Sequence, residues 1–307
     1  MSISLSRSLR RSGCGRFALM LAAASCLGLW AQTPPAPSPV AEQAAANAPA
    51  KLGSWWERSS LSYPTVPTEF LFHGTGNLHY RDAEGNTSGT VFGGGVSLTF
   101  RKLRFTDSLI ETLEKNNLTY AFNSGSAHFT QNTVLNQLDF DISKTVMAVG
   151  GIEDYRNTMI FIDRRLTEYA GLGYTPEQSE RFSLNLIGAA GYSNFLFDAT
   201  GINAINPAIV PSLPMLSPGS AGGVIMNNLH LAINPAVSLD ENASFMKYTN
   251  SILGHRWEVA VNLTIPIAKR LSIQPGYQIK EESNIYTTAL RVKPQDRTFN
   301  LGLGIQF

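Results

Sequence analysis

The last segment of the chain alternates strictly between apolar positions and polar or side-chain-free positions. The apolar positions are Phe299, Leu301, Leu303, Ile305 and Phe307, and the residues between them are Asn300, Gly302, Gly304 and Gln306. Successive side chains of a β-strand point to opposite faces, so this segment has one apolar and one polar face. The same period of two recurs over residues 257–267 and 271–280, which a short link over residues 268–270 joins into a hairpin. A chain with this pattern is expected to be all-β.

Similar segments recur through most of the chain. They lie at 68–81, 92–100, 117–129, 134–142, 145–156, 160–174, 182–193 and 236–249, with a weaker one at 224–233. Together they predict an antiparallel up-and-down barrel of about 10–12 strands, the higher number depending on the weak segment.

Two segments depart from simple alternation. In Ile160–Tyr174, Arg164 and Glu168 fall on the face of the apolar residues. A bulge near Arg164 and Arg165 would move one of the two charges off that face, but the sequence does not show a bulge. In Thr106–Lys115, apolar residues instead follow a helical spacing. We therefore expect a short helix there, capping a loop.

The start of the chain has the layout of a secretory signal peptide. Four arginines between residues 7 and 16 precede an apolar run over residues 17–30, which is too short to cross a bilayer comfortably as a helix. We predict a signal peptide over residues 1–31, with Ala24 and Ser25 as alternative cleavage sites and a lipoprotein signal at Cys26 as a further alternative. The other cysteine, Cys14, also lies in this region, so a mature chain would have no thiol for a disulfide or a metal.

Residues 32–67 are rich in proline and alanine, which predicts a disordered linker before a barrel over residues 68–307. Charged residues make up 15% of the chain, against about 25% in soluble domains. The net charge of +1 provides no basic surface for nucleic acid.

Alternation alone does not say which face of the barrel meets water, because a soluble barrel shows the same pattern turned inside out. The export signal favours a transmembrane barrel, and so do the aromatic residues near predicted strand ends, such as Trp257 and Tyr277. A soluble periplasmic barrel remains the alternative. A transmembrane barrel would have outer-membrane lipid as its partner, and the sequence does not indicate an oligomeric state.

The chain ending resembles the assembly signal of outer-membrane barrels, carried here by Asn300, Gly302, Ile305 and Phe307. The resemblance implies that the barrel-assembly machinery binds this strand during biogenesis. More widely, residues from about 85 to 307 resemble the outer-membrane β-barrel family that includes the salt-induced outer membrane proteins. The motifs that carry this resemblance are Glu84–Thr87, Asp163–Leu166, Ala170–Tyr174 and Asp296–Phe307. It implies a bacterial outer-membrane location and a stress-related role, but no molecular function. From the sequence as a whole we expect a non-enzymatic barrel that is structural or weakly permeable to small solutes.

The sequence shows little that points to catalysis or to a cofactor. The five histidines lack metal-ligand spacing, and the glycine-rich stretches lack the lysine of a phosphate-binding loop. Ser126 and His128 lie two residues apart on a predicted strand. An outer-membrane lipid hydrolase is therefore the alternative function.

Several charged residues lie in or beside predicted strands: Asp139, Asp141, Glu153, Asp154, Arg156, Asp163, Arg164, Arg165, Glu258 and Lys280. Charge is costly on a lipid-facing surface, so we expect most of these residues to line the lumen or the rims. Asp139, Asp141, Glu258 and Lys280 are the candidate lumen charges. They would form either a selectivity lining or, as we favour for so small a barrel, a packed salt-bridge network.

The stretch Ala199–Pro235 contains repeated prolines and glycines that argue against a continuous strand. We expect it to be an extracellular loop, folded against the rim or partly into the lumen because it is also apolar.

Overall fold

The computed structural model describes residues 61, 66, 68–84, 87–120, 126–176, 179, 181–205, 217–234, 237–283 and 295–306. The predicted signal peptide and nearly all of the predicted linker lie outside these residues, so their boundaries stay predictions. Among the described residues, no helix has both the length and the apolar character needed to cross a membrane.

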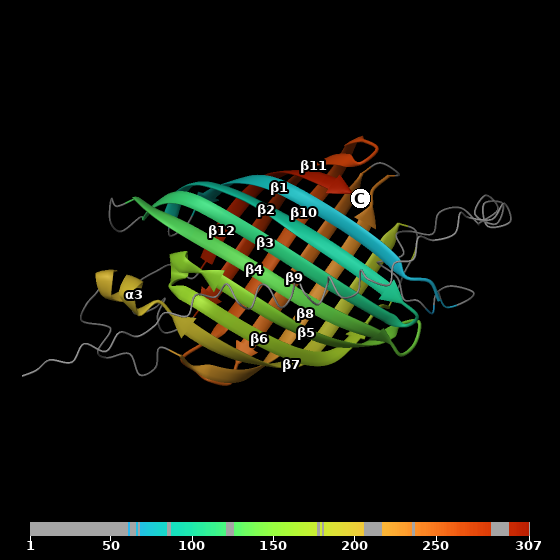
Figure 1. The fold of residues 1–307 in the computed structure, drawn as a ribbon, viewed down its shortest axis with the longest axis horizontal. Helices are drawn as coiled ribbons and strands as arrows, with labels where there is room; N and C mark the ends of the chain where they lie inside the picture. The colour runs from blue at the N-terminus through green and yellow to red at the C-terminus, as the bar shows by residue number, and fades with distance from the viewer. Residues whose placement is uncertain are drawn as a thin grey trace, which may run out of the picture. The chain divides into compact units, whose positions relative to one another are not determined.

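The described residues form a closed antiparallel barrel of twelve strands, in which each strand pairs with its neighbours in the sequence and β1 pairs with β12 (Figure 1). The strands are β1 (Leu71–Glu84), β2 (Thr87–Lys102), β3 (Phe105–Tyr120), β4 (Ser126–Asp141), β5 (Val146–Asn157), β6 (Ile162–Tyr174), β7 (Phe182–Phe197), β8 (Gly219–Ala232), β9 (Ser238–Tyr248), β10 (His255–Ala268), β11 (Leu271–Ser283) and β12 (Gln295–Gln306). Two short helices interrupt this order, η3 (Thr158–Ile160) and α3 (Ala199–Ile205).

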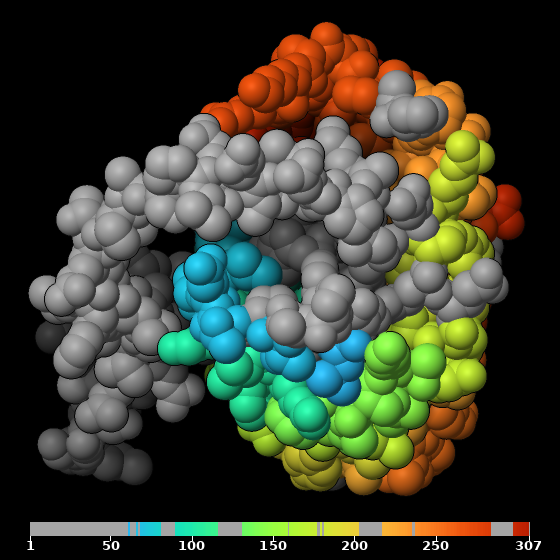
Figure 2. Space-filling view, turned by 90° about the vertical axis from the view of Figure 1, so that its right-hand side faces the viewer, coloured from blue at the N-terminus to red at the C-terminus, as the bar shows by residue number. Residues whose placement is uncertain are grey.

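The barrel closes where the first strand meets the last. Leu78 of β1 lies opposite Leu303 of β12 on one side and opposite Gly94 of β2 on the other. β1 begins and β12 ends at the same end of the barrel, which we call the terminal end. Figure 2 looks onto this end, where the colours pass from blue through green and yellow to orange round the wall, in keeping with the strand order. The connection from β7 to β8, with α3, lies at the opposite end, which we call the distal end (Figure 1).

The outer surface of the barrel is largely apolar. Leu78, Phe92 and Ile225 are 70%, 69% and 61% exposed, whereas the inward neighbour Val91 is 2% exposed. β12 shows the same division, with Phe299, Leu301, Leu303 and Ile305 exposed on the outside. A closed barrel pairs every backbone group of its strands, and an apolar exterior matches a lipid surrounding. The prediction of an all-β transmembrane barrel is therefore confirmed.

The helix predicted over Thr106–Lys115 is wrong. These residues lie in β3, where Leu109 pairs with Leu98 on one side and with Asn136 on the other. Hydrogen-bonded ladders on both edges therefore outweigh a local apolar spacing that would suit a helix. The segment predicted at 117–129 consequently spans the end of β3 and the beginning of β4 instead of forming a strand of its own.

The 160–174 segment contains a register shift that its sequence does not show, and Arg164 and Glu168 both stay on the outward face with Leu166. The register shifts between Ile162 and Arg164 where β6 pairs with β7, and between Tyr155 and Asn157 where β6 pairs with β5. Beyond the shift, Arg165 points into the barrel and Arg164 points outward, where it bonds Asp154.

The prediction that Ala199–Pro235 contains no continuous strand is wrong. β8 occupies Gly219–Ala232, pairs with β7 and β9, and is the twelfth strand that the weak segment predicted. Its glycines suit close pairing, because a Cβ on Gly222 would lie 2.5 Å from the carbonyl oxygen of Lys247. The connection is therefore shorter than predicted, and the described part of it begins with α3.

Candidate functional site

The candidate site lies in the lumen, where charged side chains from two facing parts of the wall meet. β5 and β6 form one part, while β10 and β11 lie four to six strands away from them round the twelve-stranded barrel. Residues that touch across the lumen are therefore far apart in the sequence, by 103 to 125 positions for the bonds described below.

Arg165 of β6 is fully buried and bonds to both parts of the wall. Its Nη2 donates to Glu153 Oε1 of the neighbouring β5 at 2.8 Å, and its Nη1 donates to Glu282 Oε1 of β11 at 2.9 Å. A guanidinium carries several donors in a rigid plane, so one arginine can join two carboxylates. Arg165 therefore ties β6 to β11.

Arg256 of β10 makes a second link across the lumen. Its Nη1 donates to Glu153 Oε1 at 3.0 Å, and its Nη2 donates to Glu258 Oε2 at 3.2 Å. Glu258 also accepts a hydrogen bond from Gln278 at 2.6 Å. Glu153 thus accepts from an arginine on each side of the lumen, which makes it the central anion of the site.

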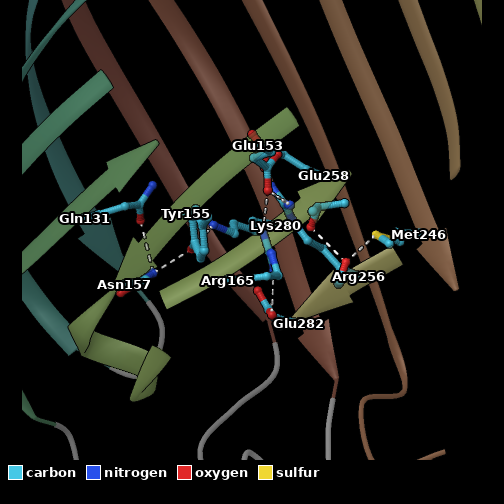
Figure 3. A network of polar contacts seen from close by, with 12 residues as sticks. Gln131, Glu153, Tyr155, Asn157, Arg165, Met246, Arg256, Glu258, Lys280 and Glu282 are labelled. Atoms are coloured by element: carbon cyan, nitrogen blue, oxygen red, sulfur yellow. Dashed lines mark hydrogen bonds and ion pairs between the residues drawn. The ribbon is translucent and has the colours of Figure 1, made fainter. Parts of the chain in front are cut away.

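Tyr155 lies among the cations of these links. The guanidinium carbons of Arg165 and Arg256 lie 4.3 Å and 5.3 Å from its ring centre, and Lys280 Nζ lies 4.3 Å from it. Lys280 also donates to the Tyr155 hydroxyl. The ring face attracts cations most strongly where water is excluded, and Tyr155 is 1% exposed. Figure 3 shows these side chains converging from the two parts of the wall.

We call this network the ionic bridge. It consists of Glu153, Tyr155, Arg165, Arg256, Glu258, Lys280 and Glu282. Its cations and carboxylates balance, so each charge removed from bulk water has a partner. The bridge lies in the distal half of the lumen, because Tyr155, Arg256 and Glu282 are each close to the distal end of their strand.

Glycines allow further contacts inside the lumen. Tyr169 of β6 reaches over Gly151 of β5, and its hydroxyl donates to Gln137 of β4 at 2.8 Å. A Cβ on Gly151 would lie 2.4 Å from the Tyr169 ring. A residue without a side chain in the middle strand therefore lets side chains of the two flanking strands meet.

The four candidate lumen charges lie at two places. Glu258 and Lys280 belong to the ionic bridge. Asp139 and Asp141 lie on β4 near the terminal end, where Asp139 accepts a hydrogen bond from Gln137 at 2.9 Å and Asp141 is buried. The structure therefore does not gather these four residues into one cluster.

The sequence candidates did not include the centre of the bridge. Glu153 and Arg165 were recognised only as charges within strands, and Tyr155 and Glu282 were not singled out. Alternation was the available signal, because Arg165 lies on the same inward face as Thr167 and Tyr169 of β6. Asp154, Arg156, Asp163 and Arg164 instead form exposed ion pairs near the distal rim.

The residues of the hydrolase alternative lie at the beginning of β4. The side chains of Ser126 and His128 lie outside the described part of the structure, so this alternative stays a prediction. No group of three or more histidine, cysteine or acidic side chains that could hold a metal occurs within the described ranges.

The solved structures to which this chain is similar include outer-membrane channels and porins. The NanC porin is 8% identical with a TM-score of 0.48, and the match covers 76% of this chain and 100% of that one. The COG4313 outer membrane channel from Pseudomonas putida F1 is 11% identical with a TM-score of 0.45, covering 77% and 96% of the two chains. The KdgM porin in complex with disordered oligogalacturonate is 10% identical with a TM-score of 0.39, covering 75% and 99%.

No curated protein matches the chain. A family match covers residues 77–307, most of the barrel and all of the ionic bridge, and it confirms the family resemblance inferred from the motifs. The chain therefore belongs to the family described as Protein of unknown function, DUF481.

Proposed function

We propose that this protein is a bacterial outer-membrane channel of low conductance, which passes small polar solutes and is narrowed by the ionic bridge. The observation that carries the proposal is the contact of Arg165 with Glu282, and of Arg256 with Glu153, across the lumen. Side chains bonded from opposite parts of the wall occupy space that water would otherwise fill. Barrels of about eight strands are filled by their own side chains and 16–18-stranded porins have wide pores, so this twelve-stranded barrel lies between the two.

The remaining part of the lumen favours a channel function and not a purely structural role for the barrel. Asn77, Asn228 and Asn242 point inward by the alternation of their strands, yet they are exposed to solvent. Inward side chains remain exposed only where the lumen beside them is accessible to water. The lumen is therefore narrowed in its distal half and polar and accessible nearer the terminal end.

Conductance in planar lipid bilayers tests this proposal. The wild-type protein should show small single-channel currents, and Arg256→Ala should increase them, because it removes two bonds of the bridge together with the side chain that crosses the lumen. Arg156→Ala is the matched control, since it breaks an arginine–aspartate pair on the exposed rim, where the side chains of Arg156 and Asp163 are 51% and 43% exposed.

Folding of each variant is checked by its heat-dependent migration on gels. Large, stable currents from the wild-type protein would contradict the narrowed lumen. Equal currents from the wild type and a folded Arg256→Ala variant would show that the bridge does not limit passage.

A further inference from the structure

We infer that one side of the lumen is a binding surface for uncharged, hydroxyl-rich solutes such as sugars or polyols. This inference rests on the proposed channel function and names its solute class. The surface is made by inward-pointing amide side chains of consecutive strands, which we call the amide wall: Asn228, Asn242, Asn262, Gln274, Gln278 and Asn300.

Strand pairing brings these amides together. Asn228 of β8 lies directly opposite Asn242 of β9. Asn262 of β10 and Asn300 of β12 both lie opposite Gly276 of β11, one on each side. A Cβ on Gly276 would lie 2.1 Å from the Oδ1 atom of Asn262 and 2.3 Å from that of Asn300. The glycine therefore lets two amides from non-adjacent strands approach each other in the lumen.

The amide wall retains hydrogen-bonding capacity. The Oδ1 atom of Asn300 is buried and has no hydrogen-bond partner within the described part of the chain. Asn228 and Asn242 are exposed although they point inward, so a solute in the lumen can reach them. A buried polar atom without a partner is unfavourable. Because this oxygen is covered, a solute can supply its missing donor only where the Asn300 side chain turns toward the lumen.

Charge is largely balanced beside the wall. Asp240 of β9 accepts from His230 Nδ1 at 2.6 Å and from the Thr264 hydroxyl at 3.5 Å, so this carboxylate already has partners. The nearest cations of the same strands, Arg256 and Lys280, are held in the ionic bridge. A charged solute would therefore find no free counter-ion among the described side chains of the amide wall.

Amides match hydroxyl groups chemically. Each amide offers both donors and an acceptor, and each hydroxyl is likewise a donor and an acceptor. A polyhydroxylated solute can satisfy several amides at once, whereas an apolar solute would leave them unpaired at a cost of about 1–3 kcal/mol for each buried group. Sites built from hydrogen-bonding groups reject ligands that lack the matching groups.

Binding of D-glucose to the folded full-length protein in detergent tests the inference without requiring conduction. Saturation-transfer NMR should show glucose bound to the wild type. The double variant Asn262→Leu/Asn300→Leu should weaken the binding about tenfold or more, as expected when two hydrogen-bonding groups are lost. Thr133→Val is the matched control. Thr133 of β4 points into the lumen from the other side of the barrel, and valine has nearly the same shape as threonine.

Ion current in the presence of glucose separates the two proposals. Glucose should lower the wild-type current at concentrations that do not affect the folded double variant. Absence of glucose binding to the wild type, or equal binding to both proteins, would overturn the amide wall and leave the channel unaffected. If glucose binds but neither the wild type nor the Arg256→Ala variant carries any current, the proposed channel function would be overturned instead.

Discussion

His79 Nε2 of β1 lies 3.0 Å from Glu114 Oε1 of β3, although β2 runs between the strands that carry them. Gly93 of β2 is opposite both residues, and a Cβ there would lie 2.4 Å from His79 Nε2 and 2.8 Å from Glu114 Cγ. The contact thus exists because the intervening residue has no side chain.

We expect Gly93→Ala to destabilise the barrel, because the added methyl group must displace the His79 ring and break its bond to Glu114. Overpacking of this kind costs about 1–3 kcal/mol. Urea unfolding in lipid vesicles measures the effect. Gly223→Ala on β8 is the control, since a Cβ at Gly223 would meet nothing within 4 Å, and an equal loss in both variants would contradict the steric explanation.

Arg165→Met should destabilise the barrel by about 3–5 kcal/mol, because it leaves the buried Glu282 carboxylate without its cation. Adding Glu282→Leu should restore part of that stability, since the stranded charge is then removed as well. A double-mutant cycle in urea measures the coupling. Arg156→Met on the exposed rim should cost at most about 1 kcal/mol. A double variant no more stable than Arg165→Met would contradict the role assigned to Glu282.

Glu111 and Glu114 lie on opposite faces of β3. Substitution by leucine should therefore raise the stability of the barrel at one position and lower it at the other. Glu111 points outward, between Val96 and Val134 of the neighbouring strands, and carboxylates on a lipid face are unfavourable. We expect Glu111→Leu to stabilise the barrel in vesicles by about 1 kcal/mol. Glu114→Leu should destabilise it, because Glu114 is buried in the lumen and bonded to His79. Destabilisation by both variants would contradict the outward orientation of Glu111.

Phe307→Asp should lower the yield of folded barrel in cells, if the chain ending is read by the assembly machinery as the resemblance implies. Phe307 lies just outside the described residues, directly after β12. Heat-dependent gel migration of outer-membrane fractions measures the yield. The same substitution at Ser217, an exposed residue of the connection before β8, is the control. A normal yield of Phe307→Asp would count against the assembly signal.

Some errors of the sequence analysis have a common physical cause. Thr106–Lys115 has an apolar spacing that fits a helix, and Gly219–Gly223 has a composition that fits a loop, yet both lie in strands with partners on each edge. Backbone pairing on two sides is a tertiary contribution that local composition does not contain.

The sequence by itself determined the class of fold. Alternation with a period of two places an apolar side chain at every second position of β12, and that pattern is independent of the strands beside it. The same reasoning did not establish the register shift in β6, where Arg164 and Glu168 stay on the outward face with Leu166.

Only the tertiary structure decided which lumen residues meet. Arg165 and Glu282 are 117 positions apart, and their contact depends on the number of strands that close the barrel and on the stagger between them. Alternation specifies the face on which a side chain lies, but not its height in the lumen or the residue opposite. The ionic bridge follows from that closure, because the two parts of the wall that supply its charges lie four to six strands apart.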